Sequence, residues 1–241
     1  MPDTIFDTPA KKVSGTGRIC YLIRHGQTAW NHANRLQGHS DVPLDPVGER
    51  QAARLAARFG ARHLHGIFTS HLQRSRRTAQ VIATGLPAEA PERAASSAAG
   101  GSAQAGNGHR LTPVVDDTLA EMHLGEWEGL TPEEIDARFA RGYQQWRMRP
   151  SSVVIPGAEP LEAFRERVRG AFERIVSGLE DGEYAIVSHG GVIAALLADA
   201  LAADYDALIR RLRLDNAGVT ALEFGTGLPH VLWVNSTSHL Q

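Results

Sequence analysis

Ile19-Cys20-Tyr21-Leu22-Ile23 is a short apolar run, and it ends in the polar, glycine-containing loop Arg24-His25-Gly26. A run of this length that stops at a polar loop is typical of a strand in the centre of a sheet. In open α/β sheets, ligands bind outside the carboxyl ends of the strands. The loop therefore also marks the place where chemistry is expected.

Strand-like and helix-like segments alternate along the rest of the chain. Asp45 followed by Pro46 indicates a helix start, because aspartate caps free N–H groups and proline fits the first helical position. We predict helices over residues 46–61, 72–84 and 192–201, and strands over residues 66–70, 184–188, 219–224 and 230–234. This alternation predicts an α/β protein, a three-layer α/β/α sandwich with a mostly parallel central sheet.

Composition and charge narrow the class of protein. The chain has 241 residues, of which 42% are hydrophobic and 22% charged, values close to the averages for globular proteins. Its single cysteine, Cys20, excludes an internal disulfide and favours a reducing, cytoplasmic compartment. A formal net charge of −2 gives no reason to expect a nucleic-acid or membrane partner.

We predict a single domain over residues 1–241 with three irregular segments. Residues 1–16 have no continuous apolar stretch and are expected to form a loose arm rather than a signal peptide. Residues 94–108 consist of alanine, serine, glycine, glutamine and asparagine, which predicts a flexible surface insertion. Residues 121–161 are expected to form an excursion that covers the site and contacts the substrate.

Two arginines and two histidines are predicted to meet at the carboxyl edge of the sheet. Arg24 would repel a protonated His25, but the pair suits a phosphoryl group, which neutral His25 attacks while Arg24 neutralises oxygen charge. Arg74 is expected at the start of the helix after the second strand, where free N–H groups favour anions. His189 follows a later strand in the same topological position as His25. Together they predict a phosphate pocket.

A proton donor is expected in the glycine-broken segment that holds Glu121, Glu126 and Glu128. Glu126 and Glu128 alternate around Trp127, so they are predicted to be solvated or to cap a helix. Glu121 follows the apolar Leu119 by two positions and is the better candidate for a partly buried acid.

Neither a metal nor a cofactor is expected. The sequence has 11 histidines but neither a His-Glu-x-x-His motif nor paired cysteines. The scattered histidines, His63 and His65 among them, are therefore interpreted as surface residues, and a metal-dependent hydrolase is the weaker hypothesis.

Taken together, these residues resemble the histidine phosphatase superfamily, the phosphoglycerate-mutase-like proteins, from Tyr21 to Leu240. The matching motifs are Arg24-His25-Gly26 through Asn31, Arg35 through Leu44, Ser70-x-Leu72-x-Arg74, Leu119-x-Glu121, Gly125-x-Trp127-Glu128-Gly129 and Val187-Ser188-His189-Gly190-Gly191. The resemblance implies that His25 becomes a phosphohistidine and that Glu121 is the acid/base. It also implies a set of residues that hold the phosphoryl group or line its site: Arg24, Arg74, His189, Asn31, Thr28, Gln37, Gly38 and Gly190.

The superfamily contains mutases and plain phosphatases. A bisphosphoglycerate-dependent mutase typically has Arg-x-Tyr after its acid/base glutamate and Gly-Asn after its second histidine, whereas this chain has Met122-His123-Leu124 and Gly190-Gly191. Both changes remove groups that would hold a second anionic part of the substrate. The prediction is a metal-independent phosphomonoester hydrolase that acts on a small phosphorylated metabolite. A bisphosphoglycerate-dependent phosphoglycerate mutase and an inactive phospho-ligand binding module remain the alternatives.

Substrate specificity is expected from the excursion over residues 121–161. Its candidate contact residues are Trp127, Tyr143, Gln144, Trp146, Arg147 and Arg149. The excursion also departs from the family where Glu159-Pro160 replaces Glu-Ser, because proline removes a hydroxyl that could cap the following helix.

Overall fold

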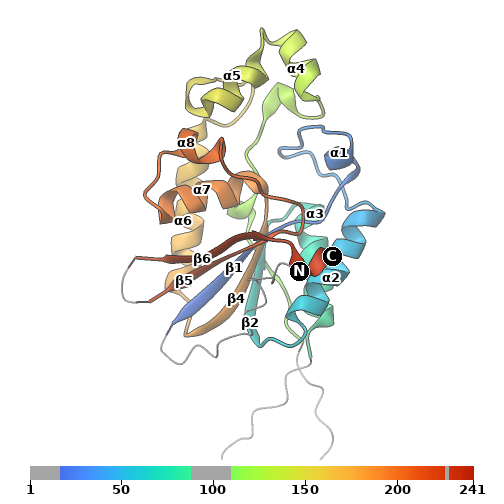
Figure 1. Cartoon of the computed structure of the whole chain (residues 1–241), viewed down its shortest axis with the longest axis vertical. Helices are drawn as coiled ribbons and strands as arrows, with labels where there is room; N and C mark the ends of the chain where they lie inside the picture. Colours follow the sequence, from blue (N-terminus) through green and yellow to red (C-terminus); the bar gives the residue numbers. More distant parts are fainter. Residues whose placement is uncertain (1–16, 88–109, 226–227) are drawn as a thin grey trace, which may run out of the picture.

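The computed structural model describes residues 17–87, 110–225 and 228–241. The predicted arm over residues 1–16 and the predicted insertion over residues 94–108 lie outside the described residues. Within the described part, one sheet has the strand order β3-β2-β4-β1-β5-β6 (Figure 1). The strands are β1 (Arg18–Arg24), β2 (Leu64–Thr69), β3 (Val114–Val115), β4 (Gly182–Ser188), β5 (Val219–Phe224) and β6 (His230–Ser236).

The central strands are parallel, and the last two form an antiparallel edge. β1 pairs with β4, β4 with β2 and β2 with β3 in parallel register. β5 pairs antiparallel with β1 and with β6, which confirms the predicted closing pair. The mostly parallel sheet is thus confirmed.

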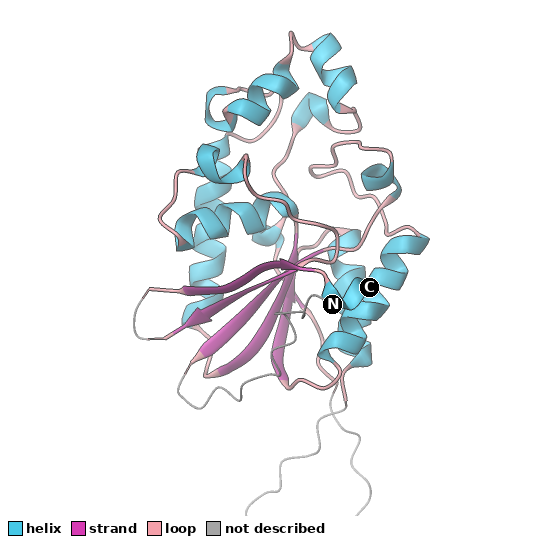
Figure 2. Ribbon diagram, viewed as in Figure 1, coloured by secondary structure: helices cyan, strands magenta, loops and turns pink. Residues whose placement is uncertain are grey.

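Helices cover both faces of this sheet, as the three-layer prediction requires (Figure 2). The larger helices on one face are α2 (Pro46–Phe59) and α3 (Gln73–Gly85), and on the other α6 (Leu161–Ser177) and α7 (Gly190–Ala200). α2 begins as predicted, because the Asp45 side chain accepts a hydrogen bond of 2.8 Å from Gly48 N–H. It ends at Phe59, two residues before the predicted end.

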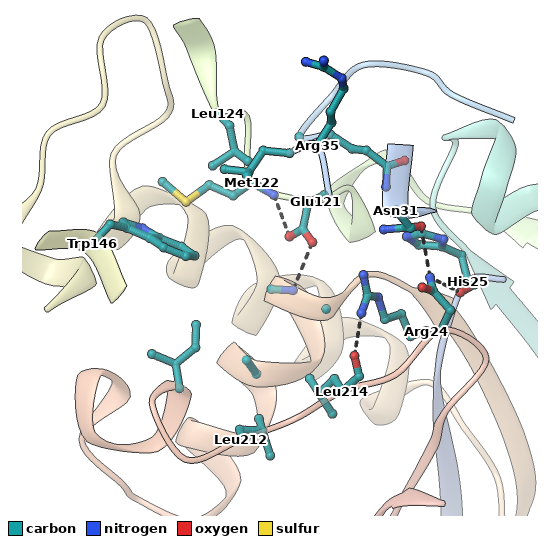
Figure 3. A pocket seen from close by; sticks show the side chains of 18 of the residues that line it. Arg24, His25, Asn31, Arg35, Glu121, Met122, Leu124, Trp146, Leu212 and Leu214 are labelled. Carbon is teal, nitrogen blue, oxygen red and sulfur yellow. Dashed lines mark hydrogen bonds between the residues drawn. The ribbon is translucent and has the colours of Figure 1, made fainter. Parts of the chain in front are cut away.

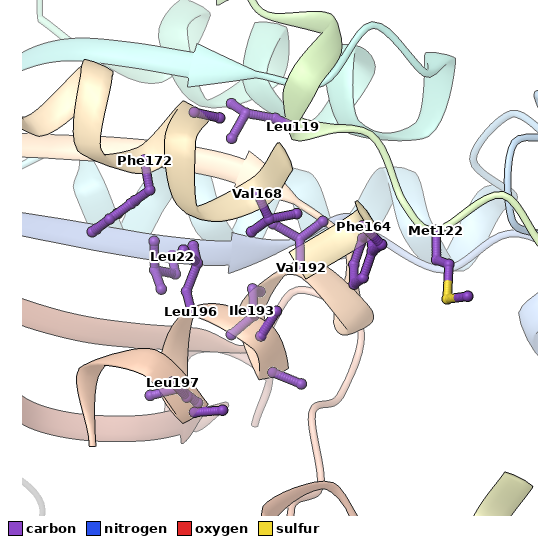
Figure 4. Packing of buried hydrophobic residues seen from close by; sticks show 14 of the residues in the cluster. Leu22, Leu119, Met122, Phe164, Val168, Phe172, Val192, Ile193, Leu196 and Leu197 are labelled. Carbon is purple, nitrogen blue, oxygen red and sulfur yellow. The ribbon is translucent and has the colours of Figure 1, made fainter. Parts of the chain in front are cut away.

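The alternation of side chains along β1 produces the two cores. Tyr21 and Ile23 pack with α2 and α3, whereas Cys20 and Leu22 pack with α6 and α7. Figure 4 shows Leu22 among the side chains that fill the second core. The Cys20 side chain is fully buried, and this burial raises the pKa of its thiol to about 12.

Short helices lie beyond the carboxyl edge of the sheet. α1 (Ala29–His32) follows β1, and α8 (Tyr205–Ile209) follows α7. α4 (Pro132–Arg138) and α5 (Gly142–Met148) belong to the excursion over residues 121–161 and lie at the top of Figure 1. Single 3-10 turns complete the described elements: Asp117–Leu119, Gly125–Trp127, Pro150–Ser152 and Ser238–Leu240. None of the described helices has the length and apolar character that crossing a membrane would need.

Candidate active site at the carboxyl edge of the sheet

His25 is the first residue after β1. Its Nδ1 atom donates a hydrogen bond of 2.7 Å to the Gly26 carbonyl oxygen, which can only accept. The ring proton is therefore on Nδ1, and Nε2 keeps its lone pair. The side chain is buried, and burial together with the cations of Arg74 and Arg24 holds the pKa of His25 well below its usual range. The site thus presents a neutral imidazole with a nucleophilic nitrogen.

Two guanidinium groups lie beside this imidazole, that of Arg74 buried and that of Arg24 half-buried. Arg24 donates from Nη1 to the Leu214 carbonyl oxygen at 2.5 Å. Arg74, in the first turn of α3, donates to the carbonyl oxygens of Gly38 and Ser40 at 2.7 and 2.8 Å. Burial lowers the pKa of Arg24 and lowers that of Arg74 to about 10. The hydrogen bonds and carboxylates around the two guanidinium groups therefore do not fully offset the loss of their hydration.

His189 lies next to His25 and directly precedes α7. The two ring centroids are 5.2 Å apart. The Nε2 atom of His189 is 2.9 Å from Ser70 Oγ and 3.3 Å from Ser75 Oγ. The His189 side chain is fully buried, and this burial, with the charge of Arg74, holds its pKa well below the usual range.

Hydrogen-bonding atoms without partners gather in this part of the site. Among the described residues, Arg24 Nε, Arg74 Nε and His189 Nδ1 are buried and have no hydrogen-bond partner. The two arginine nitrogens are donors, and His189 Nδ1 is a donor in the tautomer whose Nε2 accepts from the Ser70 hydroxyl. A buried donor without a partner destabilises the fold, so such a group is typical of a site that binds an oxyanion. Gln37 adds a buried Oε1 atom without a partner.

Glu121 reaches the site from the other side. Its Oε1 atom accepts a hydrogen bond from Met122 N–H and its Oε2 atom one from Gly191 N–H, both at 3.0 Å (Figure 3). A Cβ atom at position 191 would lie 2.3 Å from Glu121 Oε1, so glycine is needed there for this approach. Glu121 is partly buried, as predicted.

The backbone around Glu121 is fixed by an ion pair that the sequence did not reveal. Arg167 of α6 donates to the carbonyl oxygens of Thr118, Ala120 and Glu121 at 2.8, 3.0 and 3.3 Å. Its guanidinium also pairs with Glu159 at 2.6 Å. Glu159 thus supports the site through Arg167, while no side chain caps the start of α6, as the proline at that position implied.

Asn31 and Thr28 play different parts. Thr28 is fully buried and caps α1, and its N–H and hydroxyl donate to Asn31 Oδ1, each at 3.1 Å. Asn216 donates to the same oxygen at 3.2 Å and to the His25 carbonyl oxygen at 3.1 Å. Asn31 lines the cavity with its oxygen already used, whereas Thr28 does not line it. Asn216 lies in a loop without a recognisable motif, so no sequence pattern points to it.

The segment that carries Gln37 and Gly38 is held by Glu128. One oxygen of this carboxylate accepts from the N–H groups of His39 and Leu124, and the other accepts from the N–H and hydroxyl of Ser40. Burial would raise the pKa of Glu128, but these hydrogen bonds hold it below the usual range.

The prediction that Glu128 is solvated or caps a helix is therefore wrong. Its side chain is 14% exposed, and it orders the loop whose carbonyl groups hold Arg74. Glu126, by contrast, is exposed. Gly38 has a φ of 50°, and a Cβ atom there would lie 2.3 Å from Glu128 Oε1, so only glycine fits.

A cavity of about 480 Å3 joins these side chains. Of the predicted site residues, all but Thr28 and His189 line it: Arg24, His25, Asn31, Gln37, Gly38, Arg74, Glu121 and Gly190.

The predicted specificity residues divide in two. Tyr143, Trp146 and Arg147 line the cavity, while Gln144 and Arg149 do not. Trp127 is 1% exposed and belongs to the core, so its predicted contact with substrate is wrong.

No group of three or more histidine, cysteine, aspartate or glutamate side chains in the described ranges could hold a metal ion. His63 and His65 are exposed, at the sheet end away from the site.

Comparison with known proteins points to one family. The protein-family model described as histidine phosphatase superfamily (branch 1) matches residues 20–95 and 91–237 of the chain. The probable phosphoglycerate mutase GpmB of Serratia proteamaculans is 32% identical over 212 residues, which cover 84% of this chain and 83% of that protein.

Two solved structures are similar in both sequence and fold. Bacillus stearothermophilus YhfR is 29% identical with a TM-score of 0.78, and the match covers 93% of this chain and 100% of that one. A mycobacterial glucosyl-3-phosphoglycerate phosphatase in complex with VO3 is also 29% identical, with a TM-score of 0.73 and coverage of 91% and 100%.

Proposed function

The chain belongs to branch 1 of the histidine phosphatase superfamily, and on that premise we propose that it is a metal-independent phosphomonoester hydrolase with a phosphohistidine intermediate at His25. The observation that carries the proposal is the group of buried donors without partners, on Arg24, Arg74 and His189, around a neutral imidazole. Two guanidinium groups against the single carboxylate of Glu121 leave positive charge that a phosphate dianion would neutralise.

In the first half of the reaction, His25 attacks phosphorus. Its Nε2 lone pair forms the N–P bond while the bond from phosphorus to the ester oxygen breaks. Protonated Glu121 gives its proton to that oxygen, so the alcohol leaves neutral. Arg24 and Arg74 stabilise the charge on the phosphoryl oxygens throughout, and His189 adds an Nδ1 hydrogen in the tautomer whose Nε2 accepts from the Ser70 hydroxyl.

In the second half, water replaces the alcohol. Glu121, now a carboxylate, takes a proton from the water. At the same time the water oxygen attacks phosphorus and the N–P bond breaks. The electron pair of that bond returns to Nε2, inorganic phosphate leaves, and Glu121 is protonated for the next cycle. The hydrogen bond from His25 Nδ1 to the Gly26 carbonyl keeps the ring oriented during both steps.

Hydrolysis is favoured over the mutase reaction by the surroundings of Glu121. Met122 and Leu124, which stand where a mutase has arginine and tyrosine, are buried apolar residues of the cavity wall. A Cβ atom at position 191, where a mutase has asparagine, would lie 2.3 Å from Glu121 Oε1 and would displace this carboxylate from its present position. These contacts support a phosphatase, although relatives of both kinds are similar to the chain.

The test is to trap the intermediate. Wild type mixed with 32P-labelled p-nitrophenyl phosphate and quenched without acid should carry label on the peptide that contains His25. His25→Ala should carry none and should not turn over the ester, whereas the exposed histidine variant His63→Ala should behave as wild type. Label on His189 would reverse the roles, and no turnover with intact binding of phosphate would indicate an inactive binding module.

The metal-independent mechanism has its own check. Turnover should persist in excess EDTA, because arginine and histidine side chains supply the charge neutralisation. Loss of turnover on chelation, restored by a divalent metal ion, would contradict it.

A further inference from the structure

The cavity is polar at one end and apolar at the other (Figure 3). His25, Arg24 and Asn31 lie together at the polar end. Away from them, Trp146, Met122 and Leu124 face Leu212 and Leu214 across the cavity. Glu121 lies between the two ends, because it directly precedes Met122 and its carboxylate contacts the start of α7.

The apolar end is built from several separate elements. Trp146 comes from α5, where its ring lies 5.9 Å from that of Tyr143. Ile209 ends α8, and Leu212 and Leu214 follow it. Phe164 of α6 closes the wall and is fully buried. These side chains are half-buried or buried without a ligand, so a ligand that covers them would remove further apolar surface from water.

Few charged groups reach this end. Arg35 is already engaged, with Glu134 at 2.8 Å and with the Gly129 carbonyl oxygen at 2.5 Å. Arg147 also lines the cavity, from the exposed side of α5. Between Trp146, Met122 and Leu212 a hydroxyl or carboxylate group of the substrate would lie against carbon atoms, where it would lose hydrogen bonds to water.

The position of Glu121 sets the direction of the substrate. When the phosphoryl group is held at His25, the ester oxygen must lie beside Glu121 to receive its proton. The alcohol carbon atoms then continue past Glu121 into the space between Trp146 and Leu212. Resting on the proposed phosphatase function, we infer that the substrate is a phosphate monoester of a bulky apolar alcohol, aromatic or branched aliphatic, whose carbon skeleton fills the apolar end of the cavity.

The segment over residues 214–216 connects the apolar end of the cavity with the groups that hold the phosphate. The Leu214 side chain lines the cavity, and its carbonyl oxygen accepts the hydrogen bond from Arg24. Two residues later, Asn216 donates to the His25 carbonyl oxygen. A ligand in the apolar end would therefore contact the segment that orients Arg24.

The experiment compares matched pairs of esters on wild type. For the aryl pair, kcat/KM should be at least about tenfold higher for 1-naphthyl phosphate than for phenyl phosphate. For the alkyl pair, hexyl phosphate should exceed glycerol 3-phosphate by a similar factor, and 3-phosphoglycerate should be the poorest substrate. In a hydrophobic pocket, small differences in apolar contact change kcat/KM by about 10–200-fold.

Variants locate the preference in the structure. Trp146→Ala and Leu212→Ala should each lower kcat/KM for 1-naphthyl phosphate about tenfold, mainly through KM, and phenyl phosphate less. Leu232→Ala, which changes an exposed leucine on β6, should match wild type on every ester.

The outcomes separate this inference from the function on which it rests. Turnover with glycerol 3-phosphate or 3-phosphoglycerate as good as hexyl or 1-naphthyl phosphate would overturn the substrate class and leave the phosphatase standing. Unchanged KM values in Trp146→Ala and Leu212→Ala would also overturn the substrate class and leave the phosphatase standing. No turnover of any ester, with no label on His25, would overturn both.

Discussion

At the scale of single residues, the reactivity of the site depends on which atoms carry protons. The Gly26 carbonyl oxygen fixes the proton of His25 on Nδ1, and burial together with the two arginines keeps the ring neutral. Glu121 has the opposite task, since it must donate a proton and then accept one. Its carboxylate is positioned by two backbone N–H groups rather than by a side chain.

Glu121→Gln should therefore slow substrates in proportion to their need for an acid. An alkyl phosphate should lose about 10²–10⁴-fold in kcat/KM, because its alkoxide leaves poorly without a proton. p-Nitrophenyl phosphate should form the phosphoenzyme at nearly the wild-type rate and then accumulate it, which pre-steady-state kinetics would show as a burst of nitrophenol. Equal losses for both esters without a burst would remove Glu121 from the acid role.

The sequence identified residues whose position follows from a strand end or a helix start. His25 and His189 follow β1 and β4, and Arg74 starts α3, so topology alone brings them together. Asn216 and Leu214 could not be found this way. They act from a loop, and Leu214 contributes a carbonyl group that any residue would supply.

At the scale of elements, the loop over residues 37–40 links the excursion to α3. Arg74 reaches its position because the carbonyl groups of Gly38 and Ser40 hold it, and Glu128 holds that loop in turn. The sequence motif around Trp127 gave no sign of this, because a glutamate in a polar loop has the same pattern whether it faces water or a backbone.

Glu128→Ala should destabilise the protein and weaken phosphate binding together. It leaves buried N–H groups without an acceptor, so we expect a loss of about 3 kcal/mol in the free energy of unfolding, measured by urea denaturation. Because Arg74 loses its support, the inhibition constant of inorganic phosphate should also rise, by about tenfold.

Glu126→Ala is the matched control, two positions away on an exposed side chain, and should change neither quantity. An unchanged inhibition constant in Glu128→Ala, despite lower stability, would show that the loop does not position Arg74.

At the scale of the whole molecule, the fold buries neutral histidines that the unfolded chain would protonate. His25 and His189 have pKa values well below 6.5, and burial lowers that of His239 to about 4. Below pH 6.5 the unfolded chain therefore binds protons that the native protein does not. Above pH 6.5 these histidines are neutral in both states and do not change the free energy of unfolding. As the pH falls from 6.5 toward their native pKa values, they lower it progressively.

The free energy of unfolding should thus fall between pH 6.5 and 5, by up to about 1.4 kcal/mol per pH unit for each such histidine. Urea denaturation at several pH values measures the slope, and a His25→Ala/His189→Ala double variant should flatten it. Carboxylates with lowered pKa values, such as Asp45 and Asp116, also stabilise the native protein, but this contribution is lost only at lower pH. Constant stability across this range would contradict the assignment.

The burial of Cys20 makes the single thiol of this chain a reporter of global opening. It lies on β1 between β4 and β5, and both its full burial and its raised pKa keep the reactive thiolate away from reagents. Ellman's reagent should therefore label the native protein only as fast as the sheet opens. Inorganic phosphate, which binds only the folded site, should slow labelling by the factor one plus its concentration over its Kd. The unmodified chain would then report stability and ligand affinity in one colorimetric assay, and fast, phosphate-independent labelling would show instead that β1 is reached without unfolding.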